Sequence, residues 1–226
     1  MGKDVIVACD FSSAEQVFRF LDRFTDRKPF VKIGMELFYA EGPRIVREIK
    51  ARGHRIFLDL KLHDIPNTVK KAMAVLSGLD VDMCNLHVAG AKAMMEAARK
   101  NFRGTLIGVT QLTSTTEEVM REEILINRSL TEVVTEYGRN CLCTGLNGVV
   151  CSPLEAGMIH EACGDDFLTV TPGVRLAGDA AGDQRRVTTP AKARELGSDY
   201  IVVGRSITAA EDPLAAYRKC REEFVG

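Results

Sequence analysis

The sequence predicts an α/β protein, a single-domain (β/α)₈ TIM barrel over residues 1–226. Short apolar runs alternate with amphipathic stretches of helix length along the whole chain, and there are eight of these runs. Single barrel domains commonly reach this length. We find no linker or low-complexity tract that would divide the chain. An open, doubly wound parallel sheet is the alternative that the alternation leaves possible.

The eight apolar runs have the composition of buried parallel strands. They are rich in β-branched residues and almost continuously hydrophobic, as expected of strands that are covered on both faces. The predicted strands are Asp4–Cys9, Phe30–Gly34, Arg55–Leu60, Met83–His87, Leu106–Thr110, Gly148–Cys151, Phe167–Thr171 and Tyr200–Gly204.

The stretches between the strands carry signals for helix starts. The segment Ser12–Glu15 resembles a capping box ahead of an apolar face. Pro66, Pro190 and Pro213 stand where a helix can begin, because proline is favoured in the first turn. Residues Ala91–Lys100 are strong helix formers. Each predicted strand is thus followed by a helical segment.

Two stretches between predicted strands do not fit a single regular helix. Residues Thr115–Tyr137 exceed one helix, and we predict a break near Asn127–Ser129. The polar, glycine-rich insertion Arg175–Arg186 follows the seventh predicted strand directly. Active sites of α/β barrels lie on the loops that follow the strands. We therefore interpret the insertion as a lid over such a site.

Composition and charge exclude several classes of protein. The net charge is −1 and the isoelectric point about 6.4, which argues against a nucleic-acid-binding or membrane-binding surface. No apolar run approaches the roughly 18 residues of a membrane span, and the N-terminus does not have the layout of a signal peptide. The seven cysteines are odd in number and scattered, which favours reduced core thiols. We expect a cytoplasmic enzyme.

Charged residues gather at the ends of the first three predicted strands. Asp59 and Lys61 share one face of a strand, with backbones roughly 6–7 Å apart, and Asp64 follows in the loop. The segment Val31–Gly34 ends the second strand and places Lys32 beside this cluster, and Asp10 ends the first strand. Buried charges must be paired or functional, because unpaired ones are costly. We predict that these residues form a catalytic cluster at the barrel mouth.

The last two strands carry a different signal. Thr171–Arg175 follows the seventh strand and Val203–Ser206 the eighth, and each segment contains a glycine. Phosphate sites in barrels often lie after these two strands, where glycines expose backbone N–H groups. Arg205 adds a cation that can bind phosphate through two hydrogen bonds. We predict a phosphate site here; the alternative is that the glycines only serve turns.

The sequence does not predict a metal site. Of the four histidines, only His63 and His87 are placed to meet, whereas His54 and His160 are predicted on the outer sides of helices. A histidine-rich metal site needs more convergent ligands than this pair. No serine has suggestively placed histidine and aspartate partners, so acyl transfer is not expected.

Several segments together resemble one known family. The run Asp-x-Lys-x-x-Asp at residues 59–64 resembles that of the orotidine monophosphate decarboxylase suprafamily. The segments ACDF, VKIG, DLKLHDIPNTV, VTQLTS, TPGVR, DQRRV and VVGRSIT resemble those of the bacterial decarboxylases, in the same order. The resemblance spans essentially the whole chain.

The resemblance implies a cofactor-free and metal-free decarboxylation of orotidine 5′-monophosphate to uridine 5′-monophosphate (UMP) in pyrimidine synthesis. It implies a homodimer with shared active sites, in which Asp64, Ile65 and Thr68 reach the neighbouring subunit. Lys61 would donate the proton that replaces CO₂, with Asp59 beside the substrate carboxylate. The remaining implied substrate-binding residues are Asp10 and Lys32 at the ribose, Thr113 and Pro172 near the pyrimidine, and Arg175, Gln184, Gly204 and Arg205 at the phosphate.

The alternatives to this function fall into two classes, namely sister enzymes of the same suprafamily and a non-catalytic barrel. The Mg²⁺-dependent 3-keto-L-gulonate 6-phosphate decarboxylase and hexulose phosphate synthase share the Asp-x-Lys-x-x-Asp run. They lack the lysine pattern of the second strand, so Lys32 disfavours them by placing a cation in that corner. A non-catalytic phosphate-binding barrel would bind UMP without turnover.

Overall fold

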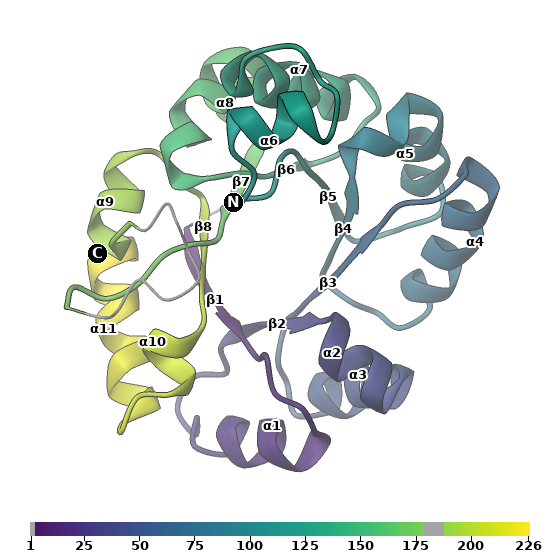
Figure 1. Cartoon of the computed structure of the whole chain (residues 1–226). Coiled ribbons are helices and arrows are strands. Elements are labelled where there is room, and N and C mark those ends of the chain that lie inside the picture. The colour runs from purple at the N-terminus through teal and green to yellow at the C-terminus, as the bar shows by residue number, and fades with distance from the viewer. Residues whose placement is uncertain (1–2, 179–187) are drawn as a thin grey trace.

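The computed structural model describes residues 3–178 and 188–226, and its centre is a closed parallel barrel. Eight strands pair in sequence order, and β1 closes the ring against β8 (Figure 1). The strands are β1 Asp4–Ala8, β2 Phe30–Gly34, β3 Ile56–Leu62, β4 Met83–His87, β5 Thr105–Val109, β6 Gly148–Val150, β7 Leu168–Thr171 and β8 Tyr200–Val203. The predicted barrel is confirmed, and the open doubly wound sheet is excluded.

Helices surround the barrel and follow the strands in turn (Figure 1). The α-helices are α1 Ala14–Leu21, α2 Met35–Glu41, α3 Pro43–Ala51, α4 Pro66–Ser77, α5 Ala91–Arg99, α6 Glu117–Glu122, α7 Leu130–Cys143, α8 Ala156–Cys163, α9 Pro190–Glu195, α10 Arg205–Thr208 and α11 Pro213–Val225. Two short 3₁₀ turns, η1 Val88–Gly90 and η2 Pro153–Glu155, follow β4 and β6.

The helix starts agree with the predicted signals. Ser13 caps α1 by accepting a hydrogen bond from the backbone N–H of Gln16. The three prolines open α4, α9 and α11 as predicted. The predicted break between residues 115 and 137 is also present. Ser129 and Glu132 form a capping box that starts α7 eight residues after α6 ends at Glu122.

The apolar residues form two layers of core. One cluster fills the barrel interior, and half of its buried members come from the first half of their strands, among them Phe30, Met83 and Tyr200. The larger cluster lies between the strands and the helices. Cys9, Cys84 and Cys151 are buried there, as predicted. Because side chains pack the amino-terminal half of the barrel, space for a ligand remains at the carboxyl ends of the strands.

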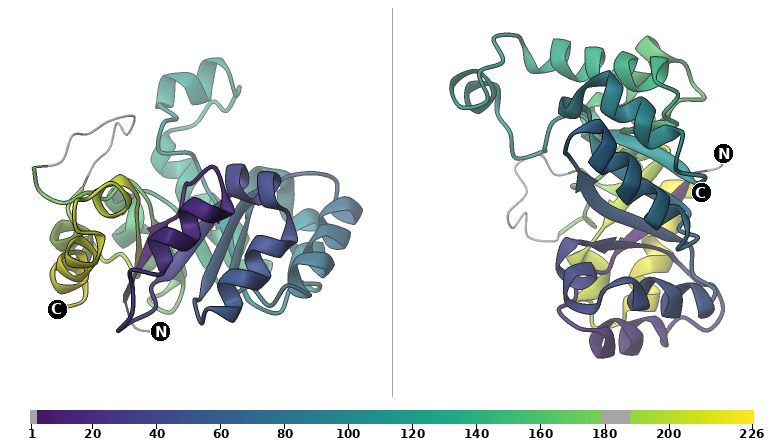
Figure 2. Two further views of the ribbon diagram at one scale, coloured as in Figure 1. Left: turned by 90° about the horizontal axis from the view of Figure 1, so that it is seen from below. Right: turned by 90° about the vertical axis from the view of Figure 1, so that its right-hand side faces the viewer.

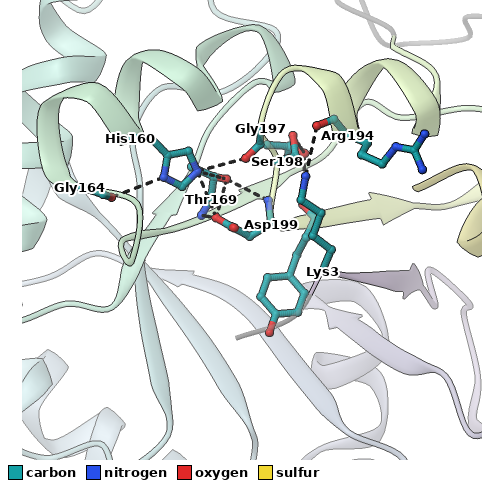
Figure 3. A network of polar contacts seen from close by, with 10 residues as sticks. Lys3, His160, Gly164, Thr169, Arg194, Gly197, Ser198 and Asp199 are labelled. Atoms are coloured by element: carbon teal, nitrogen blue, oxygen red, sulfur yellow. Dashed lines mark hydrogen bonds and ion pairs between the residues drawn. The ribbon is translucent and has the colours of Figure 1, made fainter. Parts of the chain in front are cut away.

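A polar network ties the elements together at the amino-terminal end of β7 and β8 (Figure 3). The Asp199 carboxylate accepts hydrogen bonds from the Thr169 backbone N–H and hydroxyl at 2.8 and 2.9 Å. His160 Nε2 lies 3.1 Å from the Gly197 carbonyl oxygen and 3.3 Å from Asp199. A catalytic triad needs the acid and the hydroxyl on opposite nitrogens of the histidine ring. Here the Thr169 hydroxyl and the Asp199 carboxylate both contact Nε2 of His160, so the group is not such a relay. It stabilises the barrel on the face away from the loops that follow the strands.

Two histidine predictions were wrong. His160 belongs to that network and is partly buried. His54 is 2% exposed, with Nδ1 3.0 Å from the Pro29 carbonyl oxygen. Burial lowers the pKa of His54, so it is held as a neutral core residue.

The two ends of the barrel differ in what projects from them. Figure 2 shows α6 rising beyond the strands on the side away from both chain termini. Residues 111–129, which connect β5 to α7, therefore stand at the mouth of the barrel. In the described part of the chain, no helix has the length and apolar character needed to span a bilayer.

Candidate active site

Four charges of alternating sign form a chain at the carboxyl ends of β1, β2 and β3. Lys32 Nζ lies 2.8 Å from Asp10 Oδ1 and 3.6 Å from Asp59 Oδ2. Lys61 Nζ lies 2.6 Å from the other oxygen, Asp59 Oδ1. The register of β2 and β3 sets this arrangement, because Gly34 is the partner of Asp59 across the ladder. The structure thus brings together the four residues that the strand ends predicted.

Burial and neighbouring charges together determine the ionisation of this chain. Burial alone would lower the pKa of Lys32, but Asp10 and Asp59 raise it above its ordinary value. Burial alone would raise the pKa of Asp59, but Lys32, Lys61 and a hydrogen bond from Asn85 lower it. Both groups are therefore held in their charged forms, although only 11% and 12% of their side chains are exposed.

Strand β3 is irregular where it carries these residues. Its pairing with β4 shifts between Leu58 and Leu62, and Lys61 adopts a left-handed backbone with φ of 50°. The predicted strand ended at Leu60, with Asp59 and Lys61 on one face of regular strand. The two side chains do meet, but through a bulge. Strained backbone of this kind persists only where surrounding contacts hold it in place.

Two adjoining cavities open at the mouth. The first, of about 300 Å³, has an apolar floor made by Phe57, Val109, Val150 and Val202. Lys32, Asp59, Lys61 and Thr113 also line it. The second, of about 420 Å³, is lined by Asp10, Arg175, Gly204 and Arg205. Both share Lys32, Pro172 and Val202, so one ligand with an aromatic end and an anionic end can occupy the pair.

Backbone hydrogen bonds join the segment after β7 to Thr188, the first described residue after position 178. The Arg175 N–H donates to the Thr188 carbonyl oxygen at 3.0 Å, and the Thr188 N–H donates to the Gly173 carbonyl oxygen at 3.1 Å. Gly173 has a φ of 83°, which favours glycine. Arg175 is 9% exposed and points into the second cavity beside Gly204 and Arg205. Arg175, where the predicted lid begins, is thus held by Thr188.

Some predicted site residues are not brought into these cavities. Among the described residues, Asp64, Ile65 and Thr68 are exposed and lie outside both linings. The Asp64 carboxylate accepts a hydrogen bond from the Ile65 backbone N–H at 2.6 Å. Gln184, together with most of the predicted lid, lies outside the described residues.

Other residues at this site were not predicted from the sequence. Asn85 of β4 is fully buried and donates to Asp59 Oδ1 at 2.7 Å. Gln111 and Ser114 line the first cavity, and Thr208 lines the second. At Gly34, a Cβ atom would lie 3.2 Å from Asp10 Oδ1 and 3.3 Å from Lys32 Nζ. The polar residue Asn85 inside the apolar run Met83–His87 was the one signal that could have revealed the fourth strand's contribution.

The described residues contain no group of three or more His, Cys, Asp or Glu side chains placed to hold a metal ion. The rings of His63 and His87 do meet, as predicted, with centroids 5.7 Å apart. Burial, followed by the charges of His63 and Lys61, lowers the pKa of His87.

The site and fold match one family of known proteins. A family model described as "Orotidine 5′-phosphate decarboxylase / HUMPS family" matches residues 3–220. The orotidine 5′-phosphate decarboxylase of Bacillus cytotoxicus is 54% identical over 235 residues, covering 100% of this chain and 99% of the relative. The relative of the same name from Bacillus cereus strain AH187 is also 54% identical, with the same coverage.

Solved structures agree. The crystal structure of orotidine 5′-phosphate decarboxylase from Lactobacillus acidophilus superimposes with a TM-score of 0.89 and 39% identity, covering 99% of this chain and all of that one. A protein from Geobacillus kaustophilus, described only as an uncharacterized conserved protein, superimposes with a TM-score of 0.87 and is 48% identical in sequence. The match covers 97% of this chain and 99% of that one. The matches in sequence and in structure both extend over almost the full length of the chain, and so cover the whole barrel. The chain therefore belongs to the orotidine 5′-phosphate decarboxylase / HUMPS family.

Proposed function

We propose that this protein is an orotidine 5′-phosphate decarboxylase, which converts orotidine 5′-monophosphate into UMP and CO₂ in pyrimidine synthesis. The observation that carries the proposal is the charge chain Asp10–Lys32–Asp59–Lys61 beside a cavity lined by two arginines. The full-length relatives at 54% identity bear the name of this activity.

The two cavities fit the two ends of this substrate. Arg175, Gly204 and Arg205 line the second cavity, which suits the phosphate. Lys32 lines both cavities and Asp10 lines the second, so both would contact the ribose of a substrate that spans the two. Thr113 and Pro172 line the first cavity, where the pyrimidine would lie above its apolar floor. We infer that Gln184 adds a further phosphate contact.

The reaction breaks the bond between C6 of the pyrimidine and its carboxylate. Carbon dioxide leaves, and the electron pair of the broken bond stays on C6, where no adjacent group delocalises it. The Lys61 ammonium then gives a proton to C6, and the resulting amine regains its proton from water. Lys61 is suited to both parts of the step, because the same ammonium attracts the developing charge and supplies the proton.

Asp59 contributes by its charge, but repulsion of the substrate carboxylate cannot be the main source of catalysis. Two like charges about 4 Å apart repel by about 4 kcal/mol at an effective dielectric constant of 20. Large enzymatic accelerations require up to ~23 kcal/mol. Most of the stabilisation must therefore come from the fixed charges of Lys32 and Lys61 in the transition state and from binding of the distant phosphate.

The first prediction tests the activity and its independence of metal. Purified protein should decarboxylate orotidine 5′-monophosphate in a spectrophotometric assay, and exhaustive treatment with EDTA should leave the rate unchanged. The cations of the proposed site are Lys32, Lys61 and Arg205, which a chelator does not remove. UMP binding without turnover would indicate a non-catalytic barrel. Loss of activity with EDTA and its return with Mg²⁺ would indicate a sister enzyme of the family.

A second prediction concerns the phosphate end. Arg205→Ala should raise KM roughly 10- to 100-fold, because hydrogen bonds to charged groups contribute about 1.5–3 kcal/mol. Arg19→Ala, which removes an exposed arginine paired with Glu15, is the control and should leave KM unchanged. Phosphite should activate the wild-type enzyme toward a substrate that lacks its phosphate, and Arg205→Ala should respond less. An equal response would contradict the role of Arg205.

We also infer a homodimer in which each active site is shared. Asp64 and Thr68 are exposed on one chain, and Ile65 is an exposed apolar residue at 66%. An exposed apolar side chain between two predicted substrate contacts supports burial against a second copy. The seven cysteines are free thiols, which supports a reducing compartment, and we infer a cytoplasmic location.

A further inference from the structure

We infer that Asn85 is a positioning residue for the decarboxylation, because its side-chain amide holds both the Asp59 carboxylate and the backbone of Lys61. This inference rests on the proposed function. Asn85 lies on β4 and lines neither cavity, so it acts through its neighbours rather than on the substrate.

The two hydrogen bonds fix the orientation of the amide. Nδ2 of Asn85 donates to Asp59 Oδ1 at 2.7 Å, and Oδ1 of Asn85 accepts from the Lys61 N–H at 2.8 Å. A carboxylate can only accept, and a backbone N–H can only donate. Rotating the amide by half a turn would place donor against donor and oxygen against oxygen. One side chain thus satisfies two different partners in a single orientation.

The position of Asn85 matches the irregularity of β3. In the ladder, Leu58 is the partner of Cys84 and Leu62 is the partner of Leu86. Three residues of β3 therefore lie opposite the single residue Asn85. In a regular parallel strand, the Lys61 N–H would donate to a backbone carbonyl oxygen of the neighbouring strand. Here it donates to the side chain of Asn85 instead. Burial of the whole residue makes the replacement costly to lose, since an unpaired buried polar group is destabilising.

Asn85 affects the chemistry by fixing the positions of Asp59 and Lys61. The left-handed backbone of Lys61 sets where its side chain begins, and Asp59 Oδ1 receives both Lys61 Nζ at 2.6 Å and Asn85 Nδ2. Without Asn85, the carboxylate and the lysine can both rotate. In metal sites, the partners that orient a ligand typically change affinity or activity by about 10- to 100-fold when removed, and we expect the same range for a group that orients Asp59 and Lys61. We expect this loss in kcat rather than in the binding of UMP.

Two variants with the same number of side-chain heavy atoms as asparagine separate the two hydrogen bonds. Asn85→Leu removes both. Asn85→Asp keeps an acceptor for the Lys61 N–H but replaces the donor to Asp59. At low pH the new carboxyl is protonated, and its O–H can donate to Asp59. At higher pH it is ionised and repels Asp59. The kcat of Asn85→Asp, relative to wild type, should therefore rise as the pH falls, whereas that of Asn85→Leu should not.

The wild type controls for groups that titrate in both proteins. The neighbouring charged or titratable side chains are Asp59 and Lys61 on β3, Lys32 on β2, and Cys84 and His87 on β4. All of them are present in wild type and in both variants. Dividing each variant's pH profile by that of wild type removes their shared contribution and leaves the effect of the residue at position 85.

Asn147 supplies a matched control for a merely structural role. Its Oδ1 also accepts a backbone N–H from a neighbouring strand, that of Leu106 at 2.9 Å, and Arg99 donates to it at 2.8 Å. It precedes β6 at the opposite end of the barrel from the charge chain. Asn147→Asp should therefore change thermal stability without changing kcat or its pH profile.

The measurement is kcat per active site, with sites counted by titration with UMP so that unfolded protein does not contribute. We expect Asn85→Asp to lower kcat about 10- to 100-fold at pH 8 and to bind UMP within about threefold of wild type. A wild-type kcat and pH profile in Asn85→Asp would overturn the inference, as would a UMP affinity that falls in parallel with kcat. Should Asn85→Asp not fold, Asn85→Ser tests the kcat and UMP results. An inactive wild type would instead refute the proposed function.

Discussion

Lys61→Ala should nearly abolish turnover while leaving UMP binding largely intact. The change removes the group that we propose as both the proton donor and the cation closest to the developing carbanion. Proton transfer by a positioned group contributes about 10²–10⁴-fold, and a fixed charge at a transition state contributes about 10²–10³-fold. We therefore expect kcat to fall on the order of 10⁴-fold or more. Single-turnover assays and UMP titration would measure the two effects separately.

The structure indicates why binding should survive this change. Asp59 would keep its ion pair with Lys32 at 3.6 Å and its hydrogen bond from Asn85 at 2.7 Å. The second cavity, where we propose that the phosphate binds, is lined by other residues and would not change. Lys71→Ala, which removes an exposed lysine from α4, is the matched control. Substantial residual activity, or loss of UMP binding by a folded protein, would contradict the role of Lys61 as proton donor.

The sequence predicted the fold because its signals are local. Eight apolar runs bounded by polar segments marked the strands to within two residues at each end, and prolines marked three helix starts. The pairing of Lys32 with Asp59 was also predictable. The two residues lie on consecutive parallel strands, and in a barrel such strands are neighbours.

The parts that the sequence analysis missed depend on contacts between distant residues. Nothing in the run Asp59–Leu62 indicates a bulge or a left-handed Lys61, because the register shift arises from pairing with β4. Asn85 was passed over because it lies inside an apolar strand. His54 was placed on the surface because its neighbours are polar, yet the fold buries it against Pro29. In each case the partner is more than 20 residues away in the sequence.

The proposal that two subunits share each active site can be tested with mixed dimers. Lys61→Ala and Asp64→Asn are each expected to be nearly inactive alone. In the proposed dimer, Asp64 of one subunit serves the site that holds Lys61 of the other. When the two variants are unfolded together and refolded as a mixture, random pairing should make half of the dimers mixed. One site of each mixed dimer then carries both changes, and the other carries neither.

Mixing should therefore restore about a quarter of the wild-type sites, since half of the dimers have one of two sites intact. The exposed position of Asp64, outside both cavities of its own barrel, is the reason to expect this outcome. If Asp64 acted in its own subunit, every site would keep one of the two changes and activity would not rise. Activity no greater than the sum of the two parents, with mixed dimers verified by differently tagged chains, would refute the shared site.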